Sequence, residues 1–489
     1  MKKFLICTLV LMSVTLCGIC AHADNGILRS ADMPALPDTV DTYGASLASY
    51  DGDIAEDIVK AWSNLDATIN VSKYKIRSSE LGEIYWDVYF NNPTYYYVGG
   101  QVQWYETLSG FVTEIVPQYT DTDKSKIDAY MQELRAATDE ILLYTDDAMS
   151  DFEKVMAVHD YMVLNYKYDE TLENHSITIM TTKTGVCQAY AYAFKHVMNE
   201  LDIDCAYVSS EQMNHAWNLV KIDGKWYHLD MTWDDPVTDR FGQVSHTYAL
   251  LSTKCITSMA KPHYDFNLAP LTADSDKYDN APWHSGVGSV IFAEGNTYWF
   301  DGDDLMCSDG SEIHDDIINK NRWFISDYYY LNGVYAGLAY YDGKLYYNSD
   351  KAIYSYDIKT KNKEIVKKDI GICGLFVNKN TLYYTKSTTY TVEIDGKTYT
   401  GIRFEYGGEI ELGDFFVGDC YRDEQQVVTR ICNTSDSPVF VVAFDGKKAQ
   451  TELCEQQGAC TVTFDMADKT DIFIWDANLR PIASKRTVE

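Results

Sequence analysis

Residues 184–236 read TGVCQAYAYAFKHVMNELDIDCAYVSSEQMNHAWNLVKIDGKWYHLDMTWDDP, and this stretch decides most of what the chain can be. It holds Cys187, His215 and Asp230 in that order. A cysteine nucleophile needs a base that takes its proton and a carboxylate that orients the base. We therefore expect Cys187 to be the nucleophile, His215 the base and Asp230 the orienting carboxylate.

Cys187 lies at the start of a predicted helix. The run AYAYAFKHVMNEL after Gln188 is rich in alanine and apolar residues, which indicates a buried helix with Cys187 in its first turn. The positive end of a helix dipole stabilises a thiolate, and the thiolate is the nucleophilic form of cysteine. Free cysteines are also buried for packing alone, but the place at a helix start favours a reactive thiol.

His215 and Asp230 are predicted to meet across a β-hairpin. HAWNLVKI and KWYHLDMTW read as two strands joined by Asp223-Gly224, a strong signal for a two-residue turn. Counting back from this turn pairs Trp217 with Asp230, so His215 and Asp230 become diagonal neighbours on one face, about 7–8 Å apart. A three-residue loop would put them on opposite faces.

Neighbouring titratable residues receive no catalytic role. His159 lies on the inner face of a helix predicted over 151–165, where we expect a hydrogen-bonded core histidine. His228 lies further along the hairpin from the expected site. Asp234 and Asp235 follow the second strand and are interpreted as turn formers, with the alternative that they hold the end of the site.

Three blocks together resemble the transglutaminase-like superfamily in the form found in secreted bacterial proteins. They are VHDYMVLNYKYD, GVCQAYAYAF and NHAWNLVKIDGKWYHLDMTWDDP, and they cover about 151–236. The resemblance implies a papain-like α+β fold with Cys187, His215 and Asp230 as its triad. YFNNPTYYYV resembles the region that often precedes this domain, and DIFIWDANLRPIA resembles a small β domain at the ends of secreted bacterial proteins.

The chain departs from the cross-linking members of this superfamily at one point. In those enzymes a tryptophan helps to form the oxyanion hole, whereas the segment just before Cys187 reads NHSITIMTTKT. The backbone N–H of Cys187 can supply one donor, and the second donor is unassigned. We therefore favour hydrolysis over cross-linking.

The resemblance implies attack of Cys187 on a peptide or glutamine amide carbonyl, with a thioester that water or an amine resolves. Water would make a peptidase or amidase, and an amine would make a protein-glutamine γ-glutamyltransferase. The alternative is a non-catalytic cell-surface scaffold that binds glycan or protein, which an intact triad disfavours. The expected partner is a protein or peptide, with the cell wall or surface as a candidate location. No cofactor or metal is expected, because metal-type CxxC pairs are missing. The many acidic residues leave a calcium site as an alternative, but no EF-hand spacing supports one.

The first 23 residues predict export. Lys2 and Lys3, an apolar run and an Ala-His-Ala cleavage site form a secretory signal peptide; a lipid anchor and an uncleaved helix are disfavoured. No later stretch is apolar for long enough to cross a bilayer. The 73 Asp and Glu against 41 Lys and Arg argue against nucleic acid or an anionic membrane as partner. We expect a secreted, extracellular protein of unknown oligomeric state.

Nine of the 12 cysteines lie beyond the predicted signal peptide, which contains Cys7, Cys17 and Cys20. An odd number in an exported protein suggests one free thiol, and Cys187 in that role would leave eight for disulfides. The last four are close enough in sequence to pair among themselves. The alternative is that several are buried reduced thiols.

The length predicts about three domains. Within the first, we expect helices over 55–65 and 124–144, a strand-rich segment over 85–100 and a strand over 111–119. The predicted division is a signal peptide (1–23), a flexible leader (24–47), an α/β region (48–148), a transglutaminase-like catalytic domain (149–275), a β-repeat domain (283–400) and a β-sandwich-like domain (401–489).

The half of the chain after the catalytic stretch is predicted to be all β. Tyrosine-rich runs begin at Asn296, Gly343 and Asn380, roughly 40–50 residues apart, as in propeller-like repeats. Three repeats are too few for an ordinary closed propeller, so a partial array or an irregular sheet domain is expected. PVFVVAFDG, ACTVTF and DIFIWDA then predict a β-sandwich.

Overall fold

The computed structural model describes residues 27–32 and 52–488, apart from short internal gaps. The predicted signal peptide and most of the predicted leader lie outside the described residues. The internal gaps are 146–148, 172–175, 236–240, 269, 287, 302–303, 311, 315–321, 327–328, 333–334, 414, 424, 434–436, 456–457, 467, 481 and 484.

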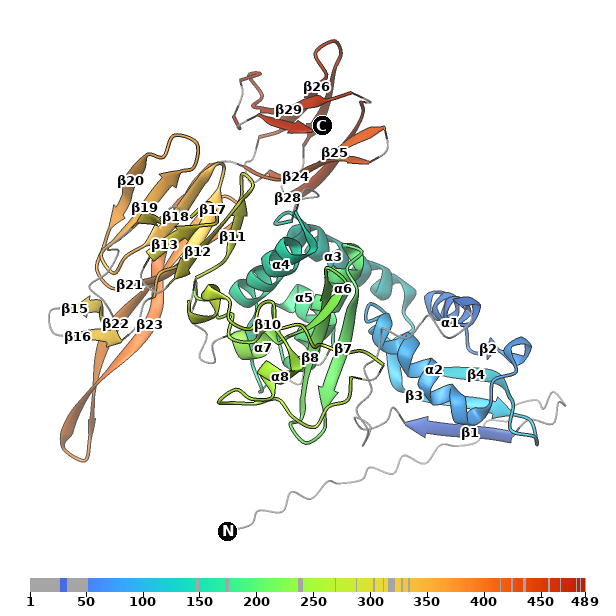
Figure 1. Ribbon diagram of the computed structural model, residues 1–489. Coiled ribbons are helices and arrows are strands. Elements are labelled where there is room, and N and C mark those ends of the chain that lie inside the picture. The colour runs from blue at the N-terminus through green and yellow to red at the C-terminus, as the bar shows by residue number, and fades with distance from the viewer. Residues whose placement is uncertain are drawn as a thin grey trace.

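An antiparallel sheet with the strand order β1-β3-β4-β2 forms the N-terminal region, and two helices pack on it (Figure 1). Trp62 of α1, Tyr85 of α2 and Ile115 of β4 share one buried cluster. The predicted helix over 55–65 and the strand over 111–119 are confirmed. The elements are β1 (Ile27–Asp32), α1 (Gly52–Asn64), β2 (Ile69–Asn70), η1 (Ser72–Tyr74), α2 (Ser78–Asn91), β3 (Val98–Glu106) and β4 (Val112–Tyr119).

Two predictions for this region were wrong. Residues 27–32, expected to belong to a flexible leader, form β1, which pairs with β3. The aromatic-rich start of 85–100, expected to be a strand, forms the second half of α2. Leu81, Tyr85 and Val88 are buried at helical spacing, so burial of one helical face outweighed the strand preference of the aromatic residues.

The central region places a four-stranded antiparallel sheet, in the order β10-β9-β8-β7, against the buried helix α6. Val155 of α4, Phe194 of α6 and Val220 of β8 belong to one buried cluster. The predicted helices over 124–144 and 151–165 are confirmed. The elements are α3 (Lys124–Leu142), α4 (Asp151–Asn165), β5 (Lys167–Tyr168), α5 (Ile179–Thr182), β6 (Thr184–Gly185), α6 (Cys187–Glu200), β7 (Cys205–Ser210), β8 (His215–Ile222), β9 (Lys225–Leu229), α7 (Met231–Asp234), β10 (Ala249–Leu251) and α8 (Thr253–Ile256).

The β8–β9 hairpin has the predicted register. Ile222 pairs with Lys225, and the turn residues Asp223 and Gly224 have φ of 51° and 73°, as a type I′ turn requires. The second strand is shorter than expected, because it ends at Leu229 and the next residue caps α7.

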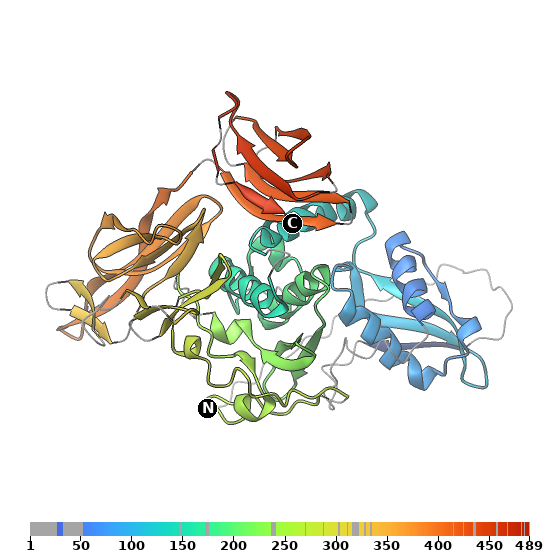
Figure 2. The same ribbon diagram turned by 45° about the horizontal axis from the view of Figure 1, so that its top comes forward.

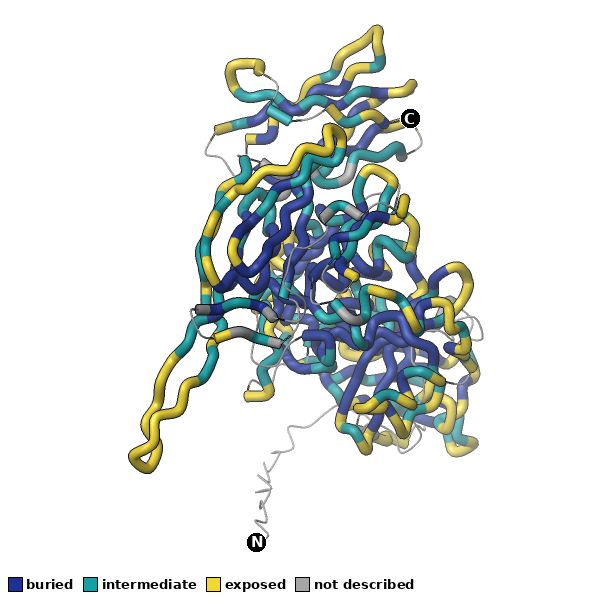
Figure 3. The backbone as a smooth tube through the Cα atoms, turned by 60° about the vertical axis from the view of Figure 1, so that its left-hand side comes forward, coloured by how far each residue is buried: buried dark blue, intermediate teal, exposed yellow. Residues whose placement is uncertain are grey.

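The next region consists of separate antiparallel sheets made from strands consecutive in sequence. Each tyrosine-rich run contains a strand, as predicted, while the propeller-like arrangement of these repeats stays a prediction. The long β22–β23 hairpin projects from the body, and its tip is exposed (Figure 3). The elements are η2 (Pro282–Ser285), β11 (Ile291–Ala293), β12 (Asn296–Asp301), β13 (Asp304–Cys307), β14 (Glu312–His314), β15 (Arg322–Ser326), β16 (Tyr329–Asn332), β17 (Leu338–Tyr341), β18 (Lys344–Asn348), β19 (Ala352–Asp357), β20 (Lys363–Lys368), β21 (Ile372–Asn378), β22 (Thr381–Ile394) and β23 (Lys397–Glu411).

Two sheets, β24-β25-β28 and β27-β26-β29-β30, share one buried cluster at the C-terminal end. This is the packing expected of a β-sandwich. Figure 2 shows the three peripheral regions arranged around the central helices. The strands are β24 (Phe415–Asp423), β25 (Gln426–Asn433), β26 (Val439–Phe444), β27 (Ala449–Cys454), β28 (Gly458–Asp465), β29 (Thr470–Trp475) and β30 (Arg486–Val488).

Two of the last four cysteines do not follow the expected pairing. Cys432 is a buried free thiol and Cys460 a half-buried one. The last four cysteines therefore do not form two disulfides among themselves in this structure. Cys205 and Cys307 are likewise buried free thiols, as the alternative interpretation expected. Among the helices that the structure describes, none is long and apolar enough to cross a membrane.

Candidate active site

Cys187 is the first residue of α6, where the chain leaves an extended conformation at Val186. Its side chain is a half-buried free thiol. The first N–H groups of a helix have no partner within the helix and carry the positive end of its dipole. The fold therefore puts a sulfur atom where an anion is stabilised and where backbone donors are available, as the sequence predicts.

His215 and Asp230 form a buried pair. His215 Nε2 donates to Asp230 Oδ2 at 2.6 Å, and their exposed fractions are 7% and 1%. Asp230 is held on its other oxygen by the start of α7: Oδ1 accepts from the backbone N–H groups of Thr232 and Trp233 and from the Thr232 hydroxyl. The carboxylate thus caps a helix and orients the histidine at once.

The charges of this pair stabilise each other. Burial disfavours the imidazolium form of His215, but the charge and the hydrogen bond of Asp230, with a smaller contribution from Cys187, outweigh it and raise the pKa of His215 to about 10. Burial also opposes ionisation of Asp230, yet His215 and His263 hold the pKa of Asp230 well below its usual range. Because Nε2 of His215 donates to Asp230, Nδ1 is the ring nitrogen that remains available to Cys187. The structure brings all three predicted residues together.

His263 is a member of this group that sequence reasoning missed. Its Nε2 donates to Asp230 Oδ2 at 2.8 Å, so this oxygen accepts from two histidines. The His263 side chain is fully buried. It lies 33 residues beyond Asp230, in a loop that has no periodic pattern of apolar residues. The only signals in the sequence that could have drawn attention to it are its residue type and the neighbouring Pro262.

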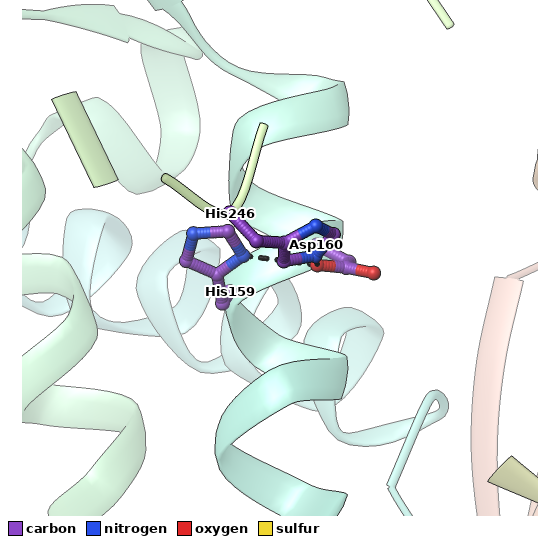
Figure 4. Close-up of side chains that lie close together, drawn as sticks. All are labelled: His159, Asp160 and His246. Carbon is purple, nitrogen blue, oxygen red and sulfur yellow. Dashed lines mark hydrogen bonds and ion pairs between the residues drawn. The ribbon is translucent and has the colours of Figure 1, made fainter. Parts of the chain in front are cut away.

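A second His-Asp-His group consists of His159, Asp160 and His246 (Figure 4). His159 Nδ1 donates to Asp160 Oδ1 at 2.9 Å, and His246 Nε2 donates to the same oxygen at 2.7 Å. His159 Nε2 donates to Asp234 Oδ2 at 3.3 Å. The expectation that His159 is a hydrogen-bonded core histidine is confirmed.

Both His-Asp-His groups have residue types that bind metal ions. In each, however, one carboxylate oxygen lies between two histidine nitrogens at 2.6–2.9 Å, which is hydrogen-bonding distance. In this structure the histidines and the carboxylate of each group form a hydrogen-bonded ion cluster.

The interpretation of Asp234 and Asp235 as turn formers was wrong. Both are buried. Asp234 Oδ1 accepts from the Tyr248 backbone N–H at 2.9 Å, and Asp235 accepts from the Tyr190 hydroxyl at 2.6 Å. They tie α7 to the segment before β10 and to α6, and so hold the end of the site. The physical reason is that buried carboxylates need donors, and the fold supplies them from distant segments.

His228 has a structural place. Its Nδ1 accepts from Trp217 Nε1 at 2.9 Å, and its Nε2 donates to the Thr253 hydroxyl at 3.0 Å. Burial lowers the pKa of His228 to about 3, so it is neutral at ordinary pH. It links the hairpin to α8 beside the candidate site, and no hydrogen bond joins it to Cys187, His215 or Asp230 among the described residues.

We expect the ion cluster of Figure 4 to make stability depend on pH. Burial favours neutral His159, but Asp160 and Asp234 outweigh it and raise its pKa from 6.5 to about 9. His159 therefore contributes stability below pH 6.5 that is lost as the pH rises through 9. Burial opposes the charge of Asp160, but His246 and His159 lower its pKa from 3.8 to about 2, so its contribution is present above pH 3.8 and lost as the pH falls through 2.

Thermal unfolding measured from pH 3 to 10 checks this expectation. The melting temperature should fall on both sides, and His159→Gln should flatten the alkaline limb only in part, because His215 is also held protonated by Asp230. An alkaline limb with the same slope in the variant would contradict the role given to His159.

Comparisons with known proteins identify relatives of the part of the chain that carries the site. Residues 136–231, which include all three site residues, match the family model of the transglutaminase-like superfamily. Human kyphoscoliosis peptidase is 24% identical over 144 residues, covering 24% of this chain and 22% of the human protein. The mouse kyphoscoliosis peptidase is 25% identical over 114 residues, covering 19% and 17%. The chain thus spans about a fifth of the length of these curated relatives.

A solved structure of a TGase has 14% sequence identity and a TM-score of 0.20, covering 26% of this chain and 42% of that chain. At this score the likeness adds nothing to the match of the family model. The match of the family model covers residues 136–231, the part of the chain that carries the site.

Proposed function

Because residues 136–231 belong to the transglutaminase-like superfamily, we propose that this protein is a cysteine enzyme that acts on peptide or glutamine amide bonds, with hydrolysis as its main reaction. Cys187, His215 and Asp230 are its catalytic residues. The observation that carries the proposal is the meeting of three groups in one site: a thiol at a helix N-terminus, a histidine whose pKa that thiol helps to raise, and a buried carboxylate 2.6 Å from that histidine.

The chemistry follows from this arrangement. The Cys187 thiolate attacks the carbonyl carbon, and His215 gives its proton to the departing amine as the thioester forms. Water then attacks the thioester while His215 takes its proton, and Cys187 is released. Asp230 keeps Nε2 of His215 protonated, so that Nδ1 faces the sulfur and exchanges the proton. The backbone N–H of Cys187 is one donor to the oxyanion.

Two points support hydrolysis over amine transfer. The tryptophan that helps cross-linking enzymes to form an oxyanion hole is missing from the segment before Cys187. The curated relatives that match are named peptidases. Transfer to an amine, as in a protein-glutamine γ-glutamyltransferase, is the second candidate, because the same thioester serves both reactions.

The substrate and location are part of the proposal. The signal-peptide pattern in residues 1–23 supports a secreted protein whose substrate is a protein or peptide outside the cell or at its surface. The β-rich half would then place the enzyme near that substrate. The alternative of a non-catalytic scaffold shares these features but predicts an inert thiol at Cys187.

One experiment separates the three functions. The full chain is treated with iodoacetamide and labelled sites are mapped by mass spectrometry; separately, glutamine-containing peptides are incubated with and without a fluorescent primary amine. We expect preferential labelling of Cys187 and cleavage of peptide or side-chain amide bonds without amine incorporation. Incorporation of the amine would establish transfer instead. A Cys187 that reacts no faster than the half-buried Cys255 would overturn the enzyme proposal.

A further inference from the structure

We infer that His263 is a positioning residue of the active site: it fixes the Asp230 carboxylate and thereby the orientation of His215 toward Cys187. This inference rests on the proposed function and extends the triad by one residue from a separate loop. It starts from one observation, the convergence of two histidines on a single carboxylate oxygen.

Asp230 Oδ2 accepts from His215 at 2.6 Å and from His263 at 2.8 Å, while Oδ1 accepts from Thr232 and Trp233. Because both oxygens accept hydrogen bonds, the carboxylate cannot rotate without breaking at least one of these hydrogen bonds. The side that faces His215 is held by His263 alone among the described residues. Loss of His263 would therefore let Oδ2 move while leaving the helix cap in place.

The His263 ring is itself held rigidly. Its centroid lies 4.7 Å from that of Trp217, 4.3 Å from that of Trp233 and 5.4 Å from that of Tyr248. Its backbone N–H donates to Ile256 O at 3.1 Å, which anchors the loop to α8. Contacts with three aromatic side chains restrict rotation of the His263 ring. In the orientation that they allow, Nε2 points toward Asp230.

The His263 ring has a single polar partner for its side chain. Nε2 donates to Asp230, and Nδ1 is buried without a hydrogen-bond partner in the described structure. No second side-chain hydrogen bond therefore competes with Asp230 for the orientation of the ring.

Other titratable groups lie around this pair, and they bear on any pH measurement. His215 on β8 and His228 on β9 lie within the same aromatic group as His263, and the charge of His263 acts on His228. Tyr248 packs on His263, and its pKa is raised to about 12 by burial and then by Asp230 and Asp234. Of these three residues, only His215 donates to Asp230 Oδ2 in the described structure, and it does so beside His263.

The second His-Asp-His group is a comparison within the same molecule. There too one aspartate oxygen accepts from two histidines, but neither histidine contacts a nucleophile among the described residues. The motif by itself therefore holds buried segments together. What makes the His263 group different is that its other histidine, His215, interacts with Cys187, which helps to raise the pKa of His215.

The test compares His263→Phe with His263→Gln in the full chain. Phenylalanine keeps a ring among the three aromatic side chains but removes the donor, whereas glutamine can place an amide N–H where Nε2 was. The measurement is the rate constant for alkylation of Cys187 by iodoacetamide from pH 4 to 10, with the Cys187→Ser chain subtracted. Melting temperatures and peptide hydrolysis are measured on the same preparations.

We expect His263→Phe to lower kcat about 10²-fold with KM changed less than about threefold, as for a small misplacement of reacting groups. The acid limb of its alkylation profile should move toward neutral pH by about one unit, the scale of one lost hydrogen bond to a charged group. His263→Gln should recover most of kcat and the position of the acid limb.

The outcomes separate this inference from the function it rests on. If Cys187 in the unaltered chain is no more reactive than Cys255, the proposed enzyme fails. If Cys187 is reactive but His263→Phe keeps its pH profile and kcat, His263 has only a packing role. Equal losses in His263→Phe and His263→Gln, together with a lowered melting temperature in both, would also reject a role through the donated hydrogen bond.

Discussion

Cys187→Ala is expected to abolish amide hydrolysis and thioester formation, with kcat reduced about 10⁴-fold or more. In the proposed mechanism the sulfur at the start of α6 forms the covalent bond, and without it His215 and Asp230 have no nucleophile to activate. Initial rates of peptide cleavage and intact-mass detection of the acyl-enzyme measure the effect. The fold should persist, because Cys187 is only half-buried and loses one atom.

Cys255→Ala is the matched control. Cys255 is another half-buried free thiol of the same region, on α8, and it contacts none of the three site residues in the described structure. The Cys255→Ala variant should hydrolyse the peptide at a rate within about twofold of that of the unaltered chain. Retained hydrolysis in Cys187→Ala, at a rate near that of the unaltered chain, would reject Cys187 as the nucleophile.

Among the substitutions proposed here, Asp160→Ala is expected to lower the free energy of unfolding the most. Its carboxylate accepts from His159, from His246 and from the Val290 backbone N–H at 2.9 Å. Removing one partner of a buried ion cluster leaves uncompensated charge and costs about 3–5 kcal/mol, a large part of the 5–15 kcal/mol that typically holds a domain together. Thermal unfolding should show a melting temperature lower by roughly 10 °C.

Asp204→Ala is the control for this variant. Asp204 forms an ion pair with Lys221 at 2.8 Å, but its side chain is 64% exposed. An exposed pair contributes about 0–1 kcal/mol, so this substitution should shift the melting temperature by no more than roughly 2 °C. Equal shifts in the two variants would show that burial of the Asp160 cluster adds nothing to stability.

Local signals in the sequence were sufficient for two parts of the site. The alanine-rich run after Cys187 is a helix because its apolar residues recur at helical spacing, and Cys187 is its first residue. The Asp223-Gly224 turn set the register that brings His215 near Asp230. Both features depend on residues within one helix or one hairpin, where spacing along the chain decides which side chains meet.

Local signals in the sequence predicted the wrong secondary structure where residue type and residue spacing favoured different elements. The aromatic residues near Tyr85 fit a strand by residue type and a helix by spacing. Packing of Leu81, Tyr85 and Val88 against the N-terminal sheet decided for the helix. Residues 27–32 were likewise without a pattern of their own, and they became a strand because β3 offered a free edge.

The sequence by itself predicted Cys187, His215 and Asp230 as the candidate nucleophile, base and carboxylate, and it determined the helix and the hairpin that present them. Only the tertiary structure decided what surrounds that carboxylate. His263 reaches Asp230 across 33 residues, and His159 reaches Asp234 across 75. The reason is that a buried carboxylate must gather hydrogen-bond donors from whatever segments pack around it, and those segments carry no periodic pattern that marks them beforehand.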